Sequence, residues 1–211
     1  VSRVITGERD PDLCWSTNVG GLQSVIGGAQ SSPRAPWLIF ASSREVYGQP
    51  AQLPADEDCP LNPVNIYGRS KAEGERLIEE ARAAGMRACT IRLSNVFGTV
   101  SDHHDRVVPA FARAAAMGEP LRVDGSDHTF DFTHISDTTQ GIMALARHLM
   151  AGKDAPPPIH FLTGVPTTLG ELAHAAVELA GSRSVVREAP PRNFDVAEFV
   201  GNPARAKALL G

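Results

Sequence analysis

The chain has 211 residues, enough for one good-sized hydrophobic core or for one domain with a smaller lobe attached. Its 42% hydrophobic content is typical of a globular protein, and its formal net charge of -4 argues against nucleic acid or an anionic membrane as the main partner. Three widely spaced cysteines predict reduced thiols rather than a zinc site or a disulfide framework. Because no apolar run is long enough for a signal peptide or a membrane span, a cytoplasmic protein is expected.

The first half of the chain alternates between predicted helices and strands. Apolar residues at helical spacing predict a helix over about 12–30, and the apolar run "WLIFAS" (37–42) predicts a buried strand. A polar loop rich in proline follows. Residues 66–84 give the clearest helix of the chain, with Gly85 well placed to end it, and "MRACTIRLS" (86–94) predicts the next strand.

The second half continues the alternation. A helix is predicted over 107–117, short strands at "LRV" and "FDFTHI", a helix through "GIMALARHL", and a strand at "IHFLT". Thr168 and Glu171 have the spacing of a capping box, which predicts that the last clear helix begins there. Strands that alternate with helices predict an α/β fold with a doubly wound parallel sheet.

Polar residues follow two of the predicted strands at the points where they end. Ser42, Ser43 and Glu45 lie at the end of the first strand, and Ser94 and Asn95 lie at the end of the second. In an open α/β sheet, ligands bind at the carboxyl ends of the strands. These residues therefore predict the rim of a binding site, although Ser and Asn are also common in ordinary turns.

Tyr67 and Lys71 are four residues apart in the predicted helix, so their side chains share one face. An ammonium group near a phenol stabilises the phenolate and lowers the tyrosine pKa from about 10, which makes Tyr a usable acid or base. An isolated pair with this spacing is more often two surface residues. The neighbouring motifs favour the catalytic interpretation.

Six motifs in this chain resemble, in the same order, those of the extended short-chain dehydrogenase/reductase family, specifically its nucleotide-sugar epimerases and dehydratases such as UDP-glucose 4-epimerase. "NVGG" is similar to the family's NVxGT, "ASSREVYG" to SSxxVYG, "YGRSK" to YxxxK and "RLSNVFG" to RxxNVYG. "FDFTHISD" is similar to RDFxHVxD, and "PPRNFDV" to a late arginine motif. The resemblance implies NAD as the cofactor, with NADP as the alternative. It also implies a nucleotide-diphosphate sugar as the substrate.

The resemblance also implies a role for individual residues. Tyr67 would be the catalytic base, Lys71 would lower its pKa and hold the nicotinamide ribose, and Ser43 would steer the reacting oxygen of the sugar. Arg192 would pair with the diphosphate, for which a guanidinium is suited. The implied cofactor contacts are Asn18, Ala41, Ser42, Tyr67 and Lys71, and the implied substrate contacts are Ser43, Asn95, Arg106, Val108 and Arg192.

The implied fold is the C-terminal half of a Rossmann-like, dinucleotide-binding domain in residues 1–100 and a small substrate-binding lobe mainly in residues 101–211, with segments near 130–163 returning to the Rossmann sheet. A homodimer is implied through the helices near 12–30 and 66–84. Family members begin with a strand and a GxxGxxG turn, whereas "GGLQSVIGG" lies inside a helical pattern with no strand before it. We therefore expect a piece of a longer protein or a truncated gene product, which alone would bind NAD weakly.

Two departures from the family pattern bear on the reaction. Dehydratases carry an Asp-Glu pair after the catalytic Ser or Thr, where this chain has Arg44 and Glu45, and arginine cannot serve as the acid. Phe130 replaces an arginine that would clamp phosphate. An epimerase is the first hypothesis. The alternatives are a decarboxylase or dehydratase-like enzyme that uses Glu45, and a non-catalytic remnant that binds a nucleotide sugar or a protein partner.

No metal site is predicted. Adjacent histidines in the polar loop, His103 and His104, cannot easily face one ion together, and a third ligand at suitable spacing is missing from the sequence. His134 lies in a predicted strand and is interpreted as a structural histidine with its hydrogen bonds satisfied.

Overall fold

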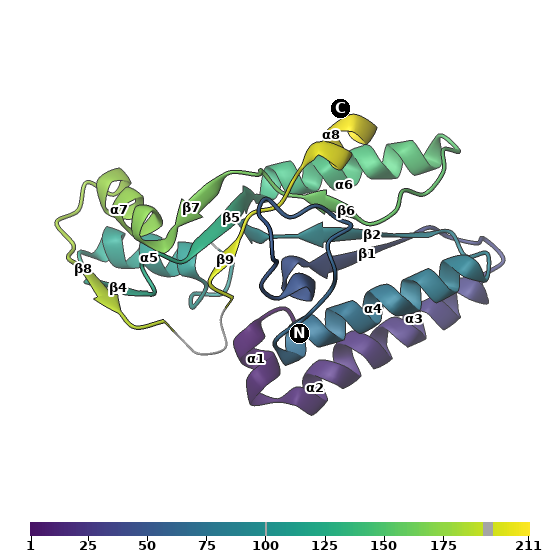
Figure 1. The fold of residues 1–211 in the computed structure, drawn as a ribbon, viewed down its shortest axis with the longest axis horizontal. Helices are drawn as coiled ribbons and strands as arrows, with labels where there is room; N and C mark the ends of the chain where they lie inside the picture. Colours follow the sequence, from purple (N-terminus) through teal and green to yellow (C-terminus); the bar gives the residue numbers. More distant parts are fainter. Residues whose placement is uncertain (100, 192–195) are drawn as a thin grey trace.

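A parallel three-stranded sheet forms the centre of the larger part of the molecule. The structure is a computed structural model that describes residues 1–99, 101–191 and 196–211. The strand order is β1 (Leu38–Ser43), β2 (Ala88–Leu93) and β6 (Ile159–Phe161), all parallel. Helix α4 (Ile66–Ala83) covers one face, and α6 (Ile135–Met150) covers the other (Figure 1). The α/β class and the parallel sheet predicted from the sequence are confirmed.

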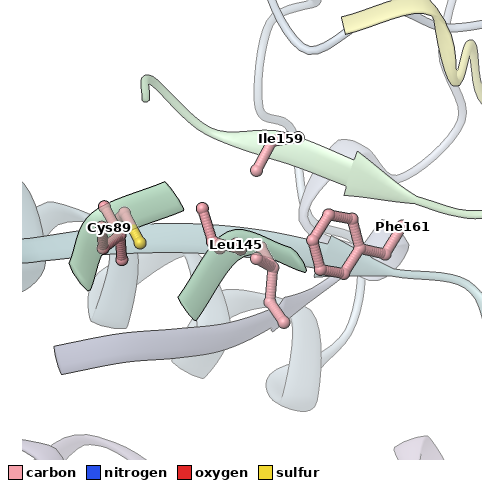
Figure 2. Packing of buried hydrophobic residues seen from close by; sticks show 6 residues of the cluster. Cys89, Leu145, Ile159 and Phe161 are labelled. Atoms are coloured by element: carbon pink, nitrogen blue, oxygen red, sulfur yellow. The ribbon is translucent and has the colours of Figure 1, made fainter. Parts of the chain in front are cut away.

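The sheet has a hydrophobic core on each face, because its strands are apolar on both sides. On the α6 side, Cys89 and Ile91 of β2 and Ile159 and Phe161 of β6 pack against Leu145 (Figure 2). On the α4 side, the core comprises Leu22, Phe40, Ile78 and Ala88. Strands buried on both faces match the continuous apolar runs in the sequence. All three cysteines are free thiols, as predicted.

The predicted helix over 12–30 is interrupted rather than uniform. The chain remains helical throughout, but residues Ser16–Gly20 form a π-helical turn. Asp10 caps the start, where its side chain accepts a hydrogen bond from the Leu13 amide. A preceding helix was not predicted, because its six residues carry few apolar positions. The elements of this region are α1 (Val4–Arg9), α2 (Pro11–Trp15), the π turn and α3 (Gly21–Gln30).

A second sheet continues from the end of β2 and leads into a small lobe. Strand β3 (Asn95–Phe97) pairs in parallel with β5 (Thr129–His134), which also pairs with β7 (Pro166–Thr168) and β9 (Glu198–Phe199). The lobe, at the left of Figure 1, has its own core of Phe111, Ala115, Leu121, Val123 and Ala173. Its elements are α5 (Val107–Met117), β4 (Leu121–Asp124), α7 (Leu169–Leu179) and β8 (Val186–Ala189).

Several predicted boundaries are confirmed at the level of single residues. Helix α5 spans the predicted residues 107–117, and the capping box of Thr168 and Glu171 begins α7 as predicted. His134 is exposed at the end of β5, where it caps α6 by accepting a hydrogen bond from the Ser136 amide. The last helix, α8 (Ala204–Leu210), was not predicted. In the described ranges, no helix is long and apolar enough to span a membrane.

Candidate active site

The site is built where β1 and β2 end. Ser42 of β1 lies beside Arg92 of β2, and Ser43 lies beside Leu93, so the hydroxyl groups of both serines reach the same sheet edge as the β2 terminus. The chain then makes one 3-10 turn over Arg44–Tyr47, and the Ser43 hydroxyl accepts a hydrogen bond from the Glu45 amide at 3.2 Å. The polar strand ends in the sequence therefore mark this edge correctly.

Helix α4 begins directly against this turn. Its cap, Asn65, accepts a hydrogen bond from the Gly68 amide at 2.7 Å and donates one from its side chain to Glu45 Oε2, also at 2.7 Å. A side chain at Gly68 would place its Cβ 2.5 Å from the Glu45 carbonyl oxygen, so only glycine allows this close approach. The first turns of α4 are thereby held with Tyr67 and Lys71 beside the strand ends.

Tyr67 is buried, and its phenol lies near the hydroxyl of Ser43. Burial raises its pKa to about 12, and the nearby Ser43 hydroxyl and the positive charge of Arg106 oppose that rise only in part. The family resemblance implies that Lys71 lowers this pKa. In this structure burial has the larger effect, and Tyr67 keeps its proton at neutral pH.

Lys71 lies on the same face of α4 as Tyr67, with its Nζ 5.8 Å from the centre of the tyrosine ring. The ammonium donates a hydrogen bond to the Ala41 carbonyl at 2.9 Å, which ties it to the end of β1. Burial lowers the pKa of this lysine. Lys71 therefore faces the same space as Tyr67 and Ser43.

A cavity of about 550 Å³ opens at this point and extends to the lobe. Its wall includes the predicted catalytic residues Ser43, Glu45, Tyr67 and Lys71. A volume of this size suits a ligand as large as a nucleotide sugar or part of a dinucleotide. Of the other predicted contacts, those that line the same cavity are Ala41, Ser42, Asn95, Arg106 and Val108.

One predicted contact is placed elsewhere, and another lies outside the described residues. Among the predicted cofactor residues in the described ranges, Asn18 alone is absent from the cavity wall; it lies in the π turn and donates a hydrogen bond to the Ser70 hydroxyl at 2.9 Å. It thus touches the residue next to Lys71 rather than the cavity itself. Arg192 and most of its motif lie outside the described residues.

Glu45 and Arg44 form a buried pair in the cavity wall. Glu45 Oε1 forms an ion pair with Arg44 Nη2 at 2.8 Å, and Glu45 Oε2 accepts a hydrogen bond from Asn65. Both carboxylate oxygens of Glu45 therefore already have partners within the protein. The guanidinium of Arg44 packs 4.5 Å from the centre of the Phe130 ring.

A buried polar network behind the serines was missed in the sequence. The Ser42 hydroxyl donates to Glu75, whose carboxylate pairs with Arg92 at 2.6 Å. Arg92 also donates to the hydroxyl of Tyr47 at 2.6 Å, and burial raises the pKa of that tyrosine. The available signal was the arginine inside the otherwise apolar strand "ACTIRL", since a buried charge needs a partner.

The arrangement fits the nicotinamide end of a dinucleotide cofactor. Hydroxyl groups of Ser43 and Tyr67 and the ammonium of Lys71 converge on one cavity at the carboxyl ends of parallel strands, where α/β enzymes bind such cofactors. Fold and site together therefore define an α/β protein with a polar cavity at the carboxyl edge of its parallel sheet.

The sequence pattern of the NAD dependent epimerase/dehydratase family matches residues 1–158, and the chain belongs to that family. It is 28% identical over 219 residues to the UDP-glucose 4-epimerase of Streptomyces lividans, covering 95% of this chain and 64% of the relative. It is 29% identical over 210 residues to UDP-glucuronic acid decarboxylase 1 of Danio rerio, covering 96% of this chain and 49% of that relative.

A solved structure shows the same arrangement of the chain. The UDP-glucose 4-epimerase from Brucella ovis in complex with NAD superimposes with a TM-score of 0.90 and 28% identity, covering 100% of this chain and 70% of the other. The chain spans less than two thirds of the length of the Streptomyces relative. The family resemblance inferred from the six motifs is confirmed.

Proposed function

We propose that this chain carries the catalytic site and part of the sugar-binding surface of an NAD(P)-dependent epimerase that acts on a nucleotide-diphosphate sugar through a keto-sugar intermediate. The observation that carries the proposal is the convergence of Ser43, Tyr67 and Lys71 on one cavity at the strand ends, with the Tyr67 phenol near the Ser43 hydroxyl. UDP-glucose 4-epimerases among its relatives support the reaction type.

Each side chain has a defined task in this proposal. Tyr67 removes a proton from a hydroxyl of the sugar and later returns it, and Ser43 holds the same sugar oxygen in position through its hydroxyl. Lys71 holds the nicotinamide ribose, because its ammonium already faces the cavity beside Ala41. NAD, when bound, supplies the group that accepts a hydride from the sugar carbon and returns it.

The remaining predicted contacts take positions around these three. Ala41 and Ser42 form the cofactor side of the wall, and Asn18 acts through its hydrogen bond to Ser70. Asn95, Arg106 and Val108 lie toward the lobe and form the substrate side of the same cavity. The division into a sheet domain and a substrate lobe is part of the proposal.

Burial raises the pKa of Tyr67, and this limits how Tyr67 can act as a base. A tyrosine that holds its proton to about pH 12 can give a proton but cannot take one at neutral pH. Binding of ligands must therefore bring positive charge closer to the phenol. Lys71 is able to do so, since its ammonium lies 5.8 Å from the ring centre on the same face of α4.

A second candidate is a nucleotide-sugar decarboxylase. Glu45 lies in the cavity wall, and the decarboxylase of Danio rerio is among the similar proteins. Against it, both oxygens of Glu45 are engaged with Arg44 and Asn65. Product analysis separates the two reactions, because only decarboxylation releases carbon dioxide.

The test is an assay of the full-length gene product with NAD and UDP-glucose, followed by NMR of the sugar. Appearance of UDP-galactose that depends on Tyr67 supports the proposal. A protein that binds the nucleotide sugar without changing it would instead support a non-catalytic role, the alternative from a different class.

We also propose that the protein forms a homodimer through the helices near 12–30 and 66–84. Leu13, Trp15 and Val25 on the first of these helices are roughly half exposed, at 49%, 45% and 52%. Apolar side chains of this size on a helix surface are typical of helix pairing across a two-fold axis. Light scattering over a concentration series tests it: monomer at every concentration contradicts the proposal.

A further inference from the structure

Arg44 is a buried cation in the wall of the cavity. It follows Ser43 directly, at the start of the 3-10 turn, and is only 9% exposed. Its Nη2 contacts Glu45 Oε1 at 2.8 Å, and the guanidinium lies over Phe130 at 4.5 Å and near Phe199 at 5.9 Å. Its Nη1 is buried and has no hydrogen-bond partner among the described residues.

This leaves the guanidinium short of acceptors. Arginine stays charged in proteins, so it cannot relieve the cost of burial by losing a proton. The aromatic rings attract the cation through their faces but accept no conventional hydrogen bond. Glu45 is a shared acceptor, because Asn65 also donates to it at 2.7 Å. Unpaired donors of a buried charge are costly, so a further acceptor should come from a ligand.

The place of Arg44 limits what that acceptor is. Ser43 precedes Arg44 in the chain, and Tyr67 lines the same cavity. These two residues are the ones assigned to the reacting hydroxyl. In a hexose that reacts at C4, the neighbouring carbon C5 carries the exocyclic group, whereas the diphosphate is attached across the ring at C1. With the C4 oxygen at Ser43 and Tyr67, as the proposed function has it, the groups next to the reacting carbon are the C3 hydroxyl and the exocyclic substituent on C5, and only the exocyclic substituent can carry a negative charge.

The chemistry of Arg44 favours a carboxylate at that substituent. A guanidinium binds a carboxylate through two parallel hydrogen bonds, and low exposure strengthens the attraction. The described cavity wall also carries one more basic than acidic residue: Arg3, Arg44, Lys71, Arg106 and Arg122 against Glu45, Asp102, Asp105 and Asp124. An anion added to this wall meets a net positive charge.

We propose that Arg44 is a specificity-determining residue that selects a nucleotide-linked hexuronic acid, whose carboxylate it binds, over the corresponding neutral hexose. This rests on the proposed function and names its substrate class. The contact with Phe130 supports this selectivity, because the ring holds the Arg44 guanidinium at the cavity wall and keeps water from one face of the guanidinium.

The experiment uses calorimetry on the NAD-loaded full-length gene product with two ligands that differ only at the exocyclic group, UDP-glucuronate and UDP-glucose. The unmodified protein should bind UDP-glucuronate at least about tenfold more tightly, the effect of one charge-assisted contact. Arg44→Gln should remove most of this preference by weakening UDP-glucuronate alone. Arg44→Lys, which keeps the charge without the planar fork, should keep part of it.

The control is Arg76→Gln on the outer face of α4, where the arginine pairs with Glu73 and Glu80 away from the cavity. It should retain the full preference. Equal binding of both ligands by the unmodified protein, or a preference that survives in Arg44→Gln, overturns the inference and leaves the epimerase proposal standing. Failure of the unmodified protein to bind either nucleotide sugar overturns both.

Discussion

The two ends of the cavity are held together by different kinds of polar contact. At the sheet end, Glu75 and Arg92 form an ion pair whose side chains are 8% and 5% exposed. At the lobe end, Arg122 and Asp124 also form a pair, at 2.7 Å, but Arg122 is 75% exposed. The first pair holds its neighbours in one arrangement, whereas water can replace either partner of the second.

This difference indicates how the site divides its tasks. The groups proposed to react, those of Ser43, Tyr67 and Lys71, stand on the strand and helix that the buried network joins. The lobe offers a small apolar core and exposed charges, which tolerate changes more easily. A rigid sheet edge suits chemistry that needs exact placement, and an adaptable lobe suits recognition of different sugars.

The largest expected effect is loss of the buried pair. Replacing Arg92 with Leu should reduce the free energy of unfolding by about 3–5 kcal/mol, because it leaves Glu75 buried without its cation. Urea denaturation measures this. A loss below about 1 kcal/mol would mean that the sheet end is no more rigid than the lobe.

Next in size is the loss of the catalytic hydroxyl. Tyr67→Phe should reduce turnover by roughly two or more orders of magnitude, since the acid-base group is removed while the ring that fills the core remains. Steady-state assays of the full-length gene product measure this, with circular dichroism to check the fold. Arg76→Gln, exposed on the same helix, serves as the matched control and should retain turnover. Near-normal turnover in Tyr67→Phe would remove that residue from its role.

A smaller effect is expected on raising the pH. The chain has two tyrosines, Tyr47 and Tyr67, and burial raises the pKa of both, that of Tyr67 to about 12. The folded chain keeps protons that the unfolded chain releases near pH 10, so this stability is complete below pH 10 and falls as the pH rises. Tyr67 alone should contribute a loss of roughly 2 kcal/mol by about pH 12.

Tyrosinate absorbance tests the same shifts directly. Neither phenol should ionise near the ordinary pKa of about 10 in the folded chain, and both should do so in denaturant. Ionisation of one tyrosine near pH 10 without unfolding would show that water reaches the sheet end.

The smallest effect is expected in the lobe. Arg122→Ala should change the free energy of unfolding by less than about 1 kcal/mol, because an exposed ion pair contributes little. Thermal or urea unfolding of this variant beside Arg92→Leu measures the contrast between the two pairs. Equal losses would remove the distinction between the rigid and the adaptable end.

Local signals predicted much of this molecule. Helix α5 was placed correctly because its apolar residues recur at helical spacing and Gly118, with a φ of 71°, ends it. The capping box at Thr168 and the serines at the end of β1 are also local patterns, and each lies where expected. Elements of two to seven residues, such as β9 and α8, give too few positions for a periodic pattern.

Contacts between distant residues were not predictable in the same way. The stacking of Arg44 on Phe130 joins positions far apart in the sequence, and only the fold brings them together. The raised pKa of Tyr67 has the same origin, because it depends on how completely other elements bury the phenol. The four-residue spacing placed Lys71 beside Tyr67. It did not reveal that burial affects the pKa of Tyr67 more than neighbouring charges do.

The most direct measurement adds a UDP-sugar to the NAD-loaded full-length gene product and follows the near-ultraviolet absorbance of reduced nicotinamide, with Tyr67→Phe in parallel. If the sheet edge is the site of sugar oxidation, the unmodified protein shows a rise in absorbance and Tyr67→Phe, which still binds the sugar, shows almost none. An equal rise in both proteins, or none in either despite bound sugar, would contradict the assignment of the chemistry to this edge.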